Sequence, residues 1–555
     1  MKNLMTVVRS VSDIVSDFER EVIAVPEIQR DVIWDADHIK NLIDSISRGY
    51  PCGALILWEP REKDRQVVKS MVRPERLKSN GGAVPRFLLL DGQQRLTALA
   101  SVFLRRERLR ELLAELEEDL PYLSANMARF PHEIEATTDA AGIKPPWAPL
   151  NSLIDGTFRN TPHFAQLPAE TRDAMQDYVQ NLRDYQFPVQ IISERDYSAV
   201  AEVFTRVNSA GTQLTGAEIH LARIVPHWRG ITRDFRKYRQ ELARKKYDLD
   251  LTFLMRSITV VECNVAQIKK LADKISKDKL SARHLDKTWN RSRAAIDRTI
   301  RVLQQGLSLD KSKFFTSKNA LVPLVYSLAK AKRAGGLQRN LVRFFILSQL
   351  SEHYGGGAET ALRKDFRTLA DSSQTPRQGL AELVKEIDAE ARKYYRGLRI
   401  GPDAVSGLPS KNILVLLMYI LMRQRNATDW GGNKAARLDQ IEPRKMQLHH
   451  VFPWDYMMKH RGIQRWYADN EFTPAEYRRQ VNDIANLTFL SQAENGNIKE
   501  TPPSQYLPIE TTKEMRKAHF IPEDPVLWKT ENFPKFLDAR RKLLAAAMTK
   551  LLKQL

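Results

Sequence analysis

The chain has 555 residues, which is too long for one ordinary hydrophobic core and predicts two or three domains. Its contents of 43% hydrophobic and 28% charged residues are typical of a folded globular protein and exclude a largely disordered chain. Lysine and arginine total 87 against 67 acidic residues, giving a net charge of +20. Such a positive field favours a polyanionic partner, with nucleic acid as the leading candidate.

Cysteine content and hydropathy indicate the compartment. Cys52 and Cys263 are too few for a disulfide framework and too far apart in the sequence for a metal-binding pair, which fits a reducing compartment. The N-terminal stretch interrupts its apolar residues with charges and lacks a signal-peptide core. The longest apolar run, 413–422, is too short for a membrane span and predicts a buried helix. We therefore expect a cytoplasmic protein with no membrane partner.

The N-terminal third predicts strands and helices around one tight turn. A helix-like opening comes first, and the next predicted elements are an extended segment to Gln29-Arg30, a helix over 37–48, a strand at 54–58 and a loop over 60–86. Phe87–Leu90 then predicts a short strand, Asp91-Gly92 a turn, and Gln93 the start of a helix.

This turn has the features of an anion site. A helix start presents unpaired N–H groups and the positive end of the helix dipole. Gln93, Gln94 and Arg95 add amide and guanidinium donors, and Asp91 could cap the helix or hold a hydrated Mg²⁺. A capped helix with solvated polar residues is the alternative, because strand–Asp-Gly–helix turns are common.

A third segment, 197–224, predicts a helix–loop–helix. Its loop, NSAGTQLT, is small and polar, and Thr212 or Thr215 can cap the helix that follows. Together, PEIQR…W, LLLDGQQRLTAL and VFTRVNSAGTQLTGAEI resemble, in order and spacing, the N-terminal domain of GmrSD-type, modification-dependent (type IV) restriction proteins. That domain is similar to the ParB and sulfiredoxin folds.

The resemblance covers roughly 10–225 and implies a nucleoside-triphosphate site with NTPase activity, coupled to sensing modified DNA. In it, Asp91, Gly92, Gln93, Gln94 and Arg95 would meet the phosphates, with four residues nearby: Gln29, Arg30, Arg206 and Asn208. Whether the nucleotide is GTP, UTP, CTP or ATP stays open.

The middle of the chain is helical and basic. A charged helix near 105–120 and a Pro-rich connection (IKPPWAPL) precede the basic segment RDFRKYRQELARKKY. Its cations could follow a phosphate backbone, and Tyr238 and Tyr247 could stack on bases; a solvated helix face is the alternative. The candidate DNA contacts here are Arg236, Lys237, Arg239, Lys245 and Lys246.

The C-terminal part contains the strongest catalytic pattern. After a polar linker, 425–446, the segment QLHHVFP predicts a strand over 447–452, and IANLTFL predicts its antiparallel partner over 484–490, with a helix near Glu494. A helical insertion separates the two strands. Imidazole and amide oxygen suit a single divalent ion, and a second imidazole can accept a proton from water. The absence of cysteines here argues against a zinc finger.

This order resembles the ββα-metal HNH nuclease domain at the C-terminus of GmrSD-type proteins, over roughly 425–545. The resemblance implies that His450 is the general base, Asn486 orients it, and His449 and Asn495 bind the metal, Mg²⁺ or Mn²⁺. The family often has Asp or Glu where this chain has His449, which leaves the site with less negative charge. In the basic C-terminal helix, Arg540 and Arg541 are expected to face solvent or DNA.

We therefore expect an α+β, mostly helical protein. Its predicted domains are a ParB/sulfiredoxin-like α/β domain (1–230), a helical, basic, DNA-contacting spacer (231–424) and an HNH endonuclease domain (425–555). The resemblance, which extends to SspE and BrxU types, implies an NTP-regulated DNA endonuclease of anti-phage defence acting on modified phage DNA. The alternatives are a ParB-like DNA-binding regulator with a degenerate nuclease domain and an RNA-cleaving toxin. A homo-oligomer is compatible with all three.

Overall fold

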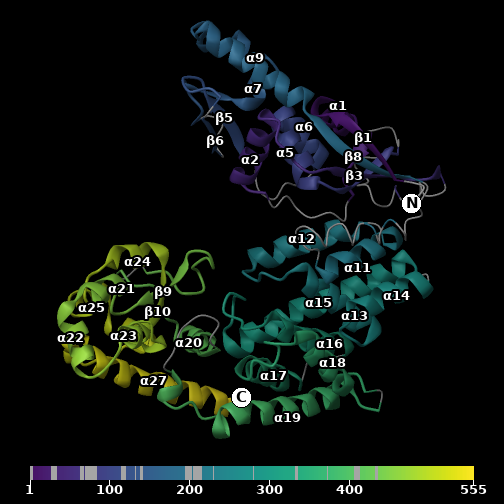
Figure 1. Ribbon diagram of the computed structural model, residues 1–555. Coiled ribbons are helices and arrows are strands. Elements are labelled where there is room, and N and C mark those ends of the chain that lie inside the picture. The colour runs from purple at the N-terminus through teal and green to yellow at the C-terminus, as the bar shows by residue number, and fades with distance from the viewer. Residues whose placement is uncertain are drawn as a thin grey trace. The chain divides into compact units, whose positions relative to one another are not determined.

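The computed structural model describes residues 4–26, 34–62, 68, 84–113, 121–131, 133–137, 142–193, 200, 203, 215–228, 230–278, 280–331, 336–371, 373–405, 413–431 and 435–555. In these residues the protein is α+β and mostly helical, as predicted (Figure 1). The chain divides into two compact units, one of Met1–Asp234 with Ile275–Ala282 and one of Phe235–Lys274 with Arg283–Leu555. No helix in the described ranges combines the length and apolar character needed to cross a membrane.

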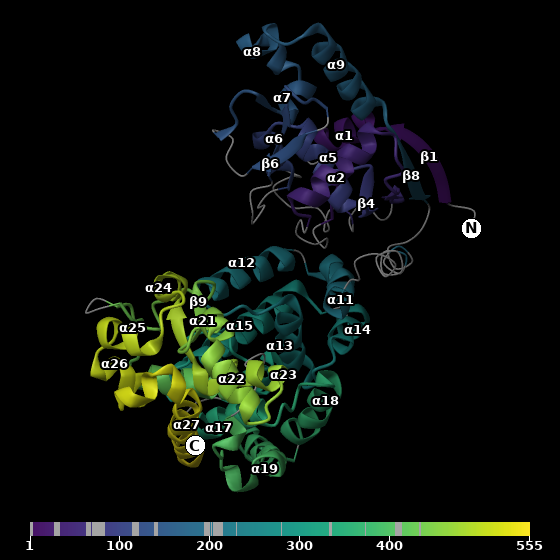
Figure 2. The same ribbon diagram turned by 60° about the vertical axis from the view of Figure 1, so that its left-hand side comes forward.

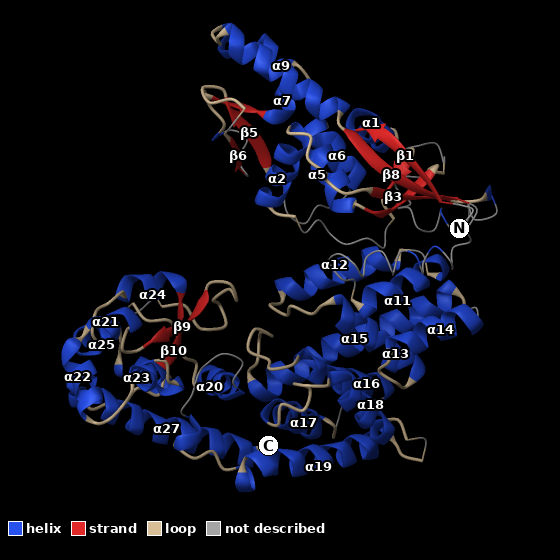
Figure 3. Ribbon diagram, viewed as in Figure 1, coloured by secondary structure: helices blue, strands red, loops and turns tan. Residues whose placement is uncertain are grey.

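The first unit is built on a five-stranded mixed sheet, visible in red in Figure 3. Its strands, in spatial order, are β1 (Leu4–Ser10), β8 (Gln186–Ser193), β3 (Leu55–Glu59), β4 (Phe87–Asp91) and β2 (Ile23–Ala24). β3 runs parallel to β8 and antiparallel to β4, while β1 runs antiparallel to β8 and β2 parallel to β4. The predicted strands at 54–58 and 87–90 are confirmed.

Four helices contribute to the core of this unit together with the sheet: α1 (Val11–Glu19), α2 (Ala36–Ser47), α5 (Gln93–Phe103) and α9 (Ala169–Asp184). Their apolar stripes are buried, as in α2, where Ile39, Leu42, Ile43 and Ile46 point inward. The helix predicted over 37–48 is thus confirmed. The helix-like opening is wrong in its first part, because β1 precedes α1. β1 is an edge strand with exposed Leu4 and Met5, so it lacks the alternating burial that identifies a strand.

A second, three-stranded sheet was not predicted from the sequence. Its order is β6 (Ile134–Thr137), β5 (Tyr122–Asn126) and β7 (Trp147–Pro149). β7 lies inside the Pro-rich stretch that the sequence presents as a connection, where Pro149 pairs with Ser124 on a sheet edge that tolerates proline. The remaining helices of the unit are α6 (Arg106–Leu113), α7 (Leu150–Ile154), α8 (Pro162–Ala165) and α11 (Gly216–Ile224), and α12 (Ile231–Arg244) crosses the boundary between the units.

The second unit is mostly helical. Its first part contains α13 (Leu251–Cys263), α14 (Ile268–Asp278, whose end belongs to the first unit), α15 (Ala282–Leu307), α16 (Leu321–Lys330), α17 (Gln338–Leu350), α18 (Ala358–Leu369), α19 (Pro376–Tyr394) and α20 (Ile413–Gln424). The side chains of Ile413–Arg423 in α20 are all buried, which confirms the helix predicted from the apolar run. The predicted division of this region from the C-terminal segment, at 424, falls within one compact unit.

The C-terminal part of this unit surrounds a two-stranded antiparallel sheet, β9 (Met446–His450) and β10 (Leu487–Ser491). Three helices fill the predicted insertion: α21 (Trp454–Lys459), α22 (Arg461–Asp469) and α23 (Pro474–Val481). After β10 come α24 (Gln492–Ile498), α25 (Pro503–Glu510), α26 (Lys513–Ala518) and the long α27 (Phe533–Gln554). An apolar cluster that includes Phe452, Tyr467, Phe533 and Phe536 holds these helices around the strands.

Candidate active site

The strands β9 and β10 and helix α24 form the frame of the candidate site. Thr488 pairs with His449 and Leu487 with His450. Helix α24 contacts both strands and lies beside β9 in Figures 1 and 2. Ser491 caps α24 by accepting a hydrogen bond from the N–H of Glu494 at 3.1 Å. The predicted strand–strand–helix order is therefore present.

His449 lies in the interior of this frame. Its side chain is 2% exposed and packs against the rings of Trp430 and Tyr506. Nδ1 of His449 lies 2.6 Å from Oδ1 of Asn495, and Nε2 lies 3.4 Å from the Tyr506 hydroxyl. Burial lowers the pKa of His449 to about 4, so the imidazole is neutral at physiological pH.

Asn495 and Gln447 extend this group of donors. Nδ2 of Asn495 donates to Oε1 of Gln447 at 2.6 Å, and Gln447 stands two positions before His449, on the same face of β9. In the described part of the chain, no group of three or more His, Cys, Asp or Glu could hold a metal. The donor chemistry nevertheless fits one divalent ion, since neutral imidazole and two amide oxygens meet on one face. Because these donors are all neutral, the ion would retain its full positive charge, and this charge would be available to interact with the phosphate of the substrate.

His450 points to a different environment. His450 is the last residue of β9, and its Nε2 lies 3.0 Å from Oδ1 of Asn482, which follows α23. Its ring also packs against Trp454 at 5.8 Å between centroids. Because an amide oxygen only accepts, Nε2 carries the hydrogen and Nδ1 keeps its lone pair. Burial lowers the pKa of His450, which leaves it neutral and able to accept a proton.

Asn486, which is predicted to orient His450, forms its hydrogen bonds with the backbone near that residue. Its Oδ1 accepts from the Phe452 N–H at 2.8 Å, and its Nδ2 donates to the carbonyls of Phe452 at 3.1 Å and Val481 at 2.8 Å. These bonds use the donors of a fully buried amide. Asn486 therefore fixes the backbone that leaves β9 after His450, and Asn482 is the residue that contacts the imidazole.

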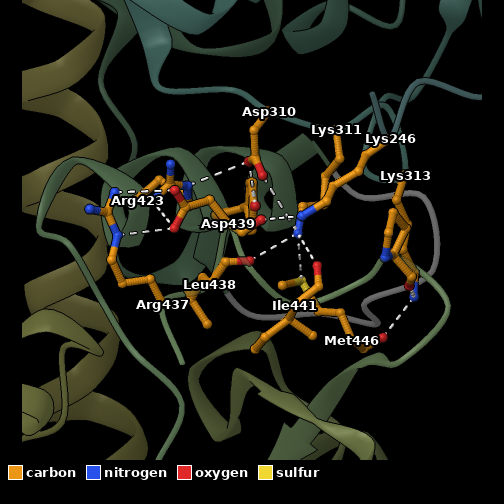
Figure 4. Close-up of polar contacts among 12 residues, drawn as sticks. Lys246, Asp310, Lys311, Lys313, Arg423, Arg437, Leu438, Asp439, Ile441 and Met446 are labelled. Carbon is orange, nitrogen blue, oxygen red and sulfur yellow. Dashed lines mark hydrogen bonds and ion pairs between the residues drawn. The ribbon is translucent and has the colours of Figure 1, made fainter. Parts of the chain in front are cut away.

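Lysines from the middle of the chain hold the segment that leads into β9 (Figure 4). Nζ of Lys311, which is fully buried, donates to the carbonyls of Leu438 at 2.9 Å and Ile441 at 3.0 Å. Lys313 donates to the carbonyls of Pro443 and Met446, both at 2.7 Å. We call this set, with Lys246 on the Asp439 carbonyl, the lysine clamp. The sequence presents 425–446 as a polar linker, but the clamp ties its second half to the helical region.

A buried ion network continues the clamp. Arg423 lies 3.4 Å from Asp310 and 3.2 Å from Asp439, and Asp310 lies 3.7 Å from Lys311. Burial lowers the pKa of Lys311 to about 8, against the raising effect of Asp310. Five backbone carbonyls of one short segment are thus held by three lysines that lie more than a hundred residues away in the sequence.

The two arginines of α27 are structural, which corrects their prediction as solvent or DNA contacts. Arg540 is fully buried and donates to the carbonyls of Ala485, His519 and Phe520. Arg541 donates to Asp483 at 2.7 Å and Gln480 at 2.9 Å. Both residues pin α27 to the segment that carries Asn486, because Ala485 and Asp483 flank it. The apolar side chains of Leu537, Leu544, Met548 and Leu551 in α27 are buried.

The two tyrosines predicted to stack on bases are also buried. Tyr238 packs edge-on against Trp289, and the Tyr247 hydroxyl donates to the Leu309 carbonyl at 2.6 Å. Of the candidate DNA contacts near them, Lys237 and Lys245 are exposed, Arg236, Arg239 and Lys246 are half-buried, Lys245 pairs with Asp297 at 2.9 Å, and Lys246 belongs to the lysine clamp.

The predicted turn of the first unit has the expected backbone. Gly92 sits between β4 and α5 with φ +94°, and a Cβ at this position would clash with the Leu55 side chain. Gly92 is the N-cap and carries no side chain, so the idea that Asp91 caps α5 is wrong. Arg95 turns back to donate to the Ala54 carbonyl and lies 3.9 Å from Asp91.

Near this turn, Gln94 Oε1 accepts from the Trp34 N–H at 3.1 Å, and Gln93 is the first residue of α5. The other predicted nucleotide contacts, Gln29, Arg30, Arg206 and Asn208, lie outside the described residues. What the described part of the turn offers is the positive end of α5 beside a guanidinium, a carboxylate and two amides.

Two residues of the C-terminal site were missed in the sequence. Gln447 could have been found, because residues two positions apart in a strand share a face and Gln447 therefore shares one with His449. Asn482 lies four positions before Asn486, and no local pattern separates the two amides. Only the end of α23 brings Asn482 to His450.

Comparison with known proteins finds one matching family model. Residues 11–225 match the family described as GmrSD restriction endonuclease, N-terminal domain. Over this segment the chain is therefore similar to the N-terminal domain of a restriction endonuclease family. The chain is also 21% identical to the uncharacterized protein MJ0686 of Methanocaldococcus jannaschii, in an alignment that covers 99% of each protein.

Proposed function

We propose that the chain is an NTP-regulated, metal-dependent HNH endonuclease of anti-phage defence that senses modified DNA and nicks or cuts it. The observation that carries this proposal is the pairing of two neutral imidazoles with different surroundings on adjacent positions of β9. His450 has a free lone pair at Nδ1, and His449 stands with amide oxygens of Asn495 and Gln447.

In the proposed reaction His450 accepts the proton of the attacking water at Nδ1. Its Nε2–H continues to donate to Oδ1 of Asn482. This hydrogen bond holds the ring in one tautomer and stabilises the imidazolium that forms. Asn486 keeps the chain after His450 in place through the Phe452 backbone. The ring of Trp454 packs against the His450 ring and helps to position it.

The residues that would hold the metal, Mg²⁺ or Mn²⁺, are His449 and Asn495, with Gln447 as a further oxygen donor. When bound, the ion supplies polarisation of the phosphate and stabilisation of the leaving oxygen. The low pKa of His449 keeps its ring neutral, with one nitrogen unprotonated. Because Nδ1 donates to Oδ1 of Asn495, this hydrogen bond would have to open, with the hydrogen on Nε2, for Nδ1 to bind the ion. Tyr506 and Trp430 fix its ring orientation from the buried side.

For the first unit we propose that the Asp91-Gly92 turn and the start of α5 receive the nucleotide phosphates. Support comes from the positive helix end, from the close approach that Gly92 permits, and from Arg95 and Gln94 at the same turn. Which nucleotide binds, and whether its hydrolysis activates or restrains cleavage, is part of the test.

The test is cleavage of a panel of phage DNAs, unmodified, glucosylated and phosphorothioated, with and without each NTP and with Mg²⁺, Mn²⁺ or EDTA. The proposal predicts metal-dependent cleavage of at least one modified DNA that changes with one NTP. Nucleotide-dependent DNA binding without cleavage under any metal would instead identify a ParB-like regulator. Cleavage of RNA but not DNA in parallel reactions would identify an RNA-directed toxin.

A further inference from the structure

A basic hollow opens on the surface of the second unit, away from β9 and β10 in the sequence. It has a volume of about 460 Å³ and is lined by Val265, Gln267, Lys270, Arg363, Phe366 and Arg367. The first three residues belong to the connection between α13 and α14 and to the first turn of α14; the last three belong to α18. All six residues lie in the same compact unit.

The charge in this hollow is positive and uncompensated. Lys270, Arg363 and Arg367 have exposed side chains, and none of the three forms an ion pair in the described structure. Glu359, one turn before Arg363 on α18, pairs with Arg256 at 3.6 Å. Lys364, the neighbouring cation, pairs with Glu386 at 3.5 Å. Acidic partners in this region thus go to cations that do not line the hollow.

The spacing of these cations suits phosphate. Arg363 and Arg367 are four positions apart and extend from the same face of α18, while Lys270 comes from the opposite wall. A guanidinium donates in a planar fork that matches two phosphate oxygens, and an ammonium adds a point charge. Phe366, which is buried, adds an apolar residue to the lining.

The openness of the site decides the size of the ligand. A pocket for a free nucleotide encloses most of its ligand, whereas the three cations here are solvent-exposed at the rim. Exposed cations without fixed partners are the kind of group that follows a polynucleotide backbone and releases counterions on binding. The exposure of all three cations therefore favours a phosphodiester chain over a small phosphorylated molecule.

We infer that Lys270, Arg363 and Arg367 form a binding site for backbone phosphates of DNA. This inference rests on the proposed function, because it names where the nuclease substrate is held outside the catalytic frame. The site reads charge and not base sequence, so it contributes affinity to modified and unmodified DNA alike.

The test is fluorescence anisotropy of a labelled, unmodified DNA duplex with the full chain in EDTA, across a salt series of about 0.05 to 0.3 M. The double variant Arg363→Gln, Arg367→Gln should weaken binding on the order of ten-fold. It should also lower the slope of log affinity against log salt by about 1.8, because each phosphate that is no longer neutralised accounts for about 0.9. Arg363→Lys, Arg367→Lys keeps the charges and should preserve most of the slope.

A matched control removes the same charge elsewhere in the unit. Lys385→Gln, Lys393→Gln changes two exposed cations on α19 and should leave both affinity and slope unchanged. Thermal melts of all variants check folding; because the substituted side chains are exposed, the melting temperatures should agree with that of the wild type.

Three outcomes would overturn the inference. The first is a glutamine variant that binds DNA like the wild type while the wild type binds and cleaves DNA, which leaves the proposed function intact. The second is an equal loss of affinity in the α19 control. The third is that Arg363 and Arg367 are required for the binding of free NTP or inorganic phosphate but not for the binding of the DNA duplex. Failure of the wild type to bind or cleave any nucleic acid would instead remove the proposed function.

Discussion

Oδ1 of Asn482 lies 3.0 Å from Nε2 of His450, and this hydrogen bond leaves the other ring nitrogen of the histidine as the acceptor. Burial lowers the pKa of His450 below its ordinary value of 6.5, and the bond to Asn482 raises it in part. The acid limb of the pH–rate profile for cleavage should therefore lie below pH 6.5, because His450 loses activity only when it becomes protonated.

Replacing Asn482 by a residue with a carboxylate should shift the acid limb of the pH–rate profile. Asn482→Asp places a negative charge at Nε2, which favours the imidazolium and raises the pKa of His450 by about one unit or more. The pH–rate profile of single-turnover cleavage should shift to higher pH by that amount, with the rate at the plateau largely retained. An unshifted profile in a folded variant would show that Asn482 does not position the group that limits the rate.

Asn486 should matter for stability and activity together. Asn486→Ala removes three buried hydrogen bonds and leaves the N–H and C=O of Phe452 and the C=O of Val481 without this partner. We expect a loss of about 3 kcal/mol in the free energy of unfolding, measured by urea denaturation, and a loss of cleavage. Asn495→Ala serves as the comparison, since it removes a proposed metal ligand but no backbone support. It should reduce cleavage with a smaller change in stability.

The lysine clamp predicts a pH-dependent stability. The pKa of Lys311 is about 8 in the folded protein and near 10.5 when unfolded, so between these values the unfolded chain binds more protons. The stabilising effect of a neutral Lys311 is therefore present above pH 10.5 and is lost as pH falls through about 8.

The direction of this pH dependence can be measured by comparing the wild type with Lys311→Met, which lacks the titrating group. Between pH 8 and 10.5 the free energy of unfolding of the wild type should rise relative to that of the variant by on the order of 2 kcal/mol. The reference substitution Lys385→Met, on the surface of α19, should show no such difference from the wild type. A constant difference between wild type and Lys311→Met across this range would contradict the lowered pKa of Lys311.

The parts of this fold that the sequence predicts are those with local signals. The apolar run before Asp91-Gly92 and the amphipathic stripe after it give β4 and α5, and the two short apolar runs around His449 and Asn486 give β9 and β10. In each case hydrophobic periodicity and a turn residue lie within one short window.

The errors have a common physical origin in the burial of polar groups. Arg540 lies three positions after Leu537 and four before Leu544, so helical spacing already places it on the inward stripe. Its charge predicted an exposed position, but in the interior its guanidinium donates hydrogen bonds to three backbone carbonyls. Tyr238 similarly stands on the buried stripe of α12 with Phe235.

The site itself could be predicted only in part. His449, His450 and Asn495 are named by pattern and resemblance, whereas the distinction between Asn482 and Asn486 depends on where α23 ends. The clamp could not be predicted, because Lys311 meets the carbonyl of Leu438 across 127 positions of sequence. Contacts of that range depend on the packing of whole helices and leave no local pattern.

The central claim is tested most directly by single-turnover cleavage with His450→Ala, using a DNA that the wild type cuts in Mg²⁺ or Mn²⁺. We predict a loss of about 100-fold or more in the cleavage rate, with the affinity for DNA unchanged in EDTA. His284→Ala, an exposed histidine on α15, should cleave like the wild type. Undiminished cleavage by His450→Ala would contradict the assignment of His450 as the general base and, with it, the proposed nuclease site.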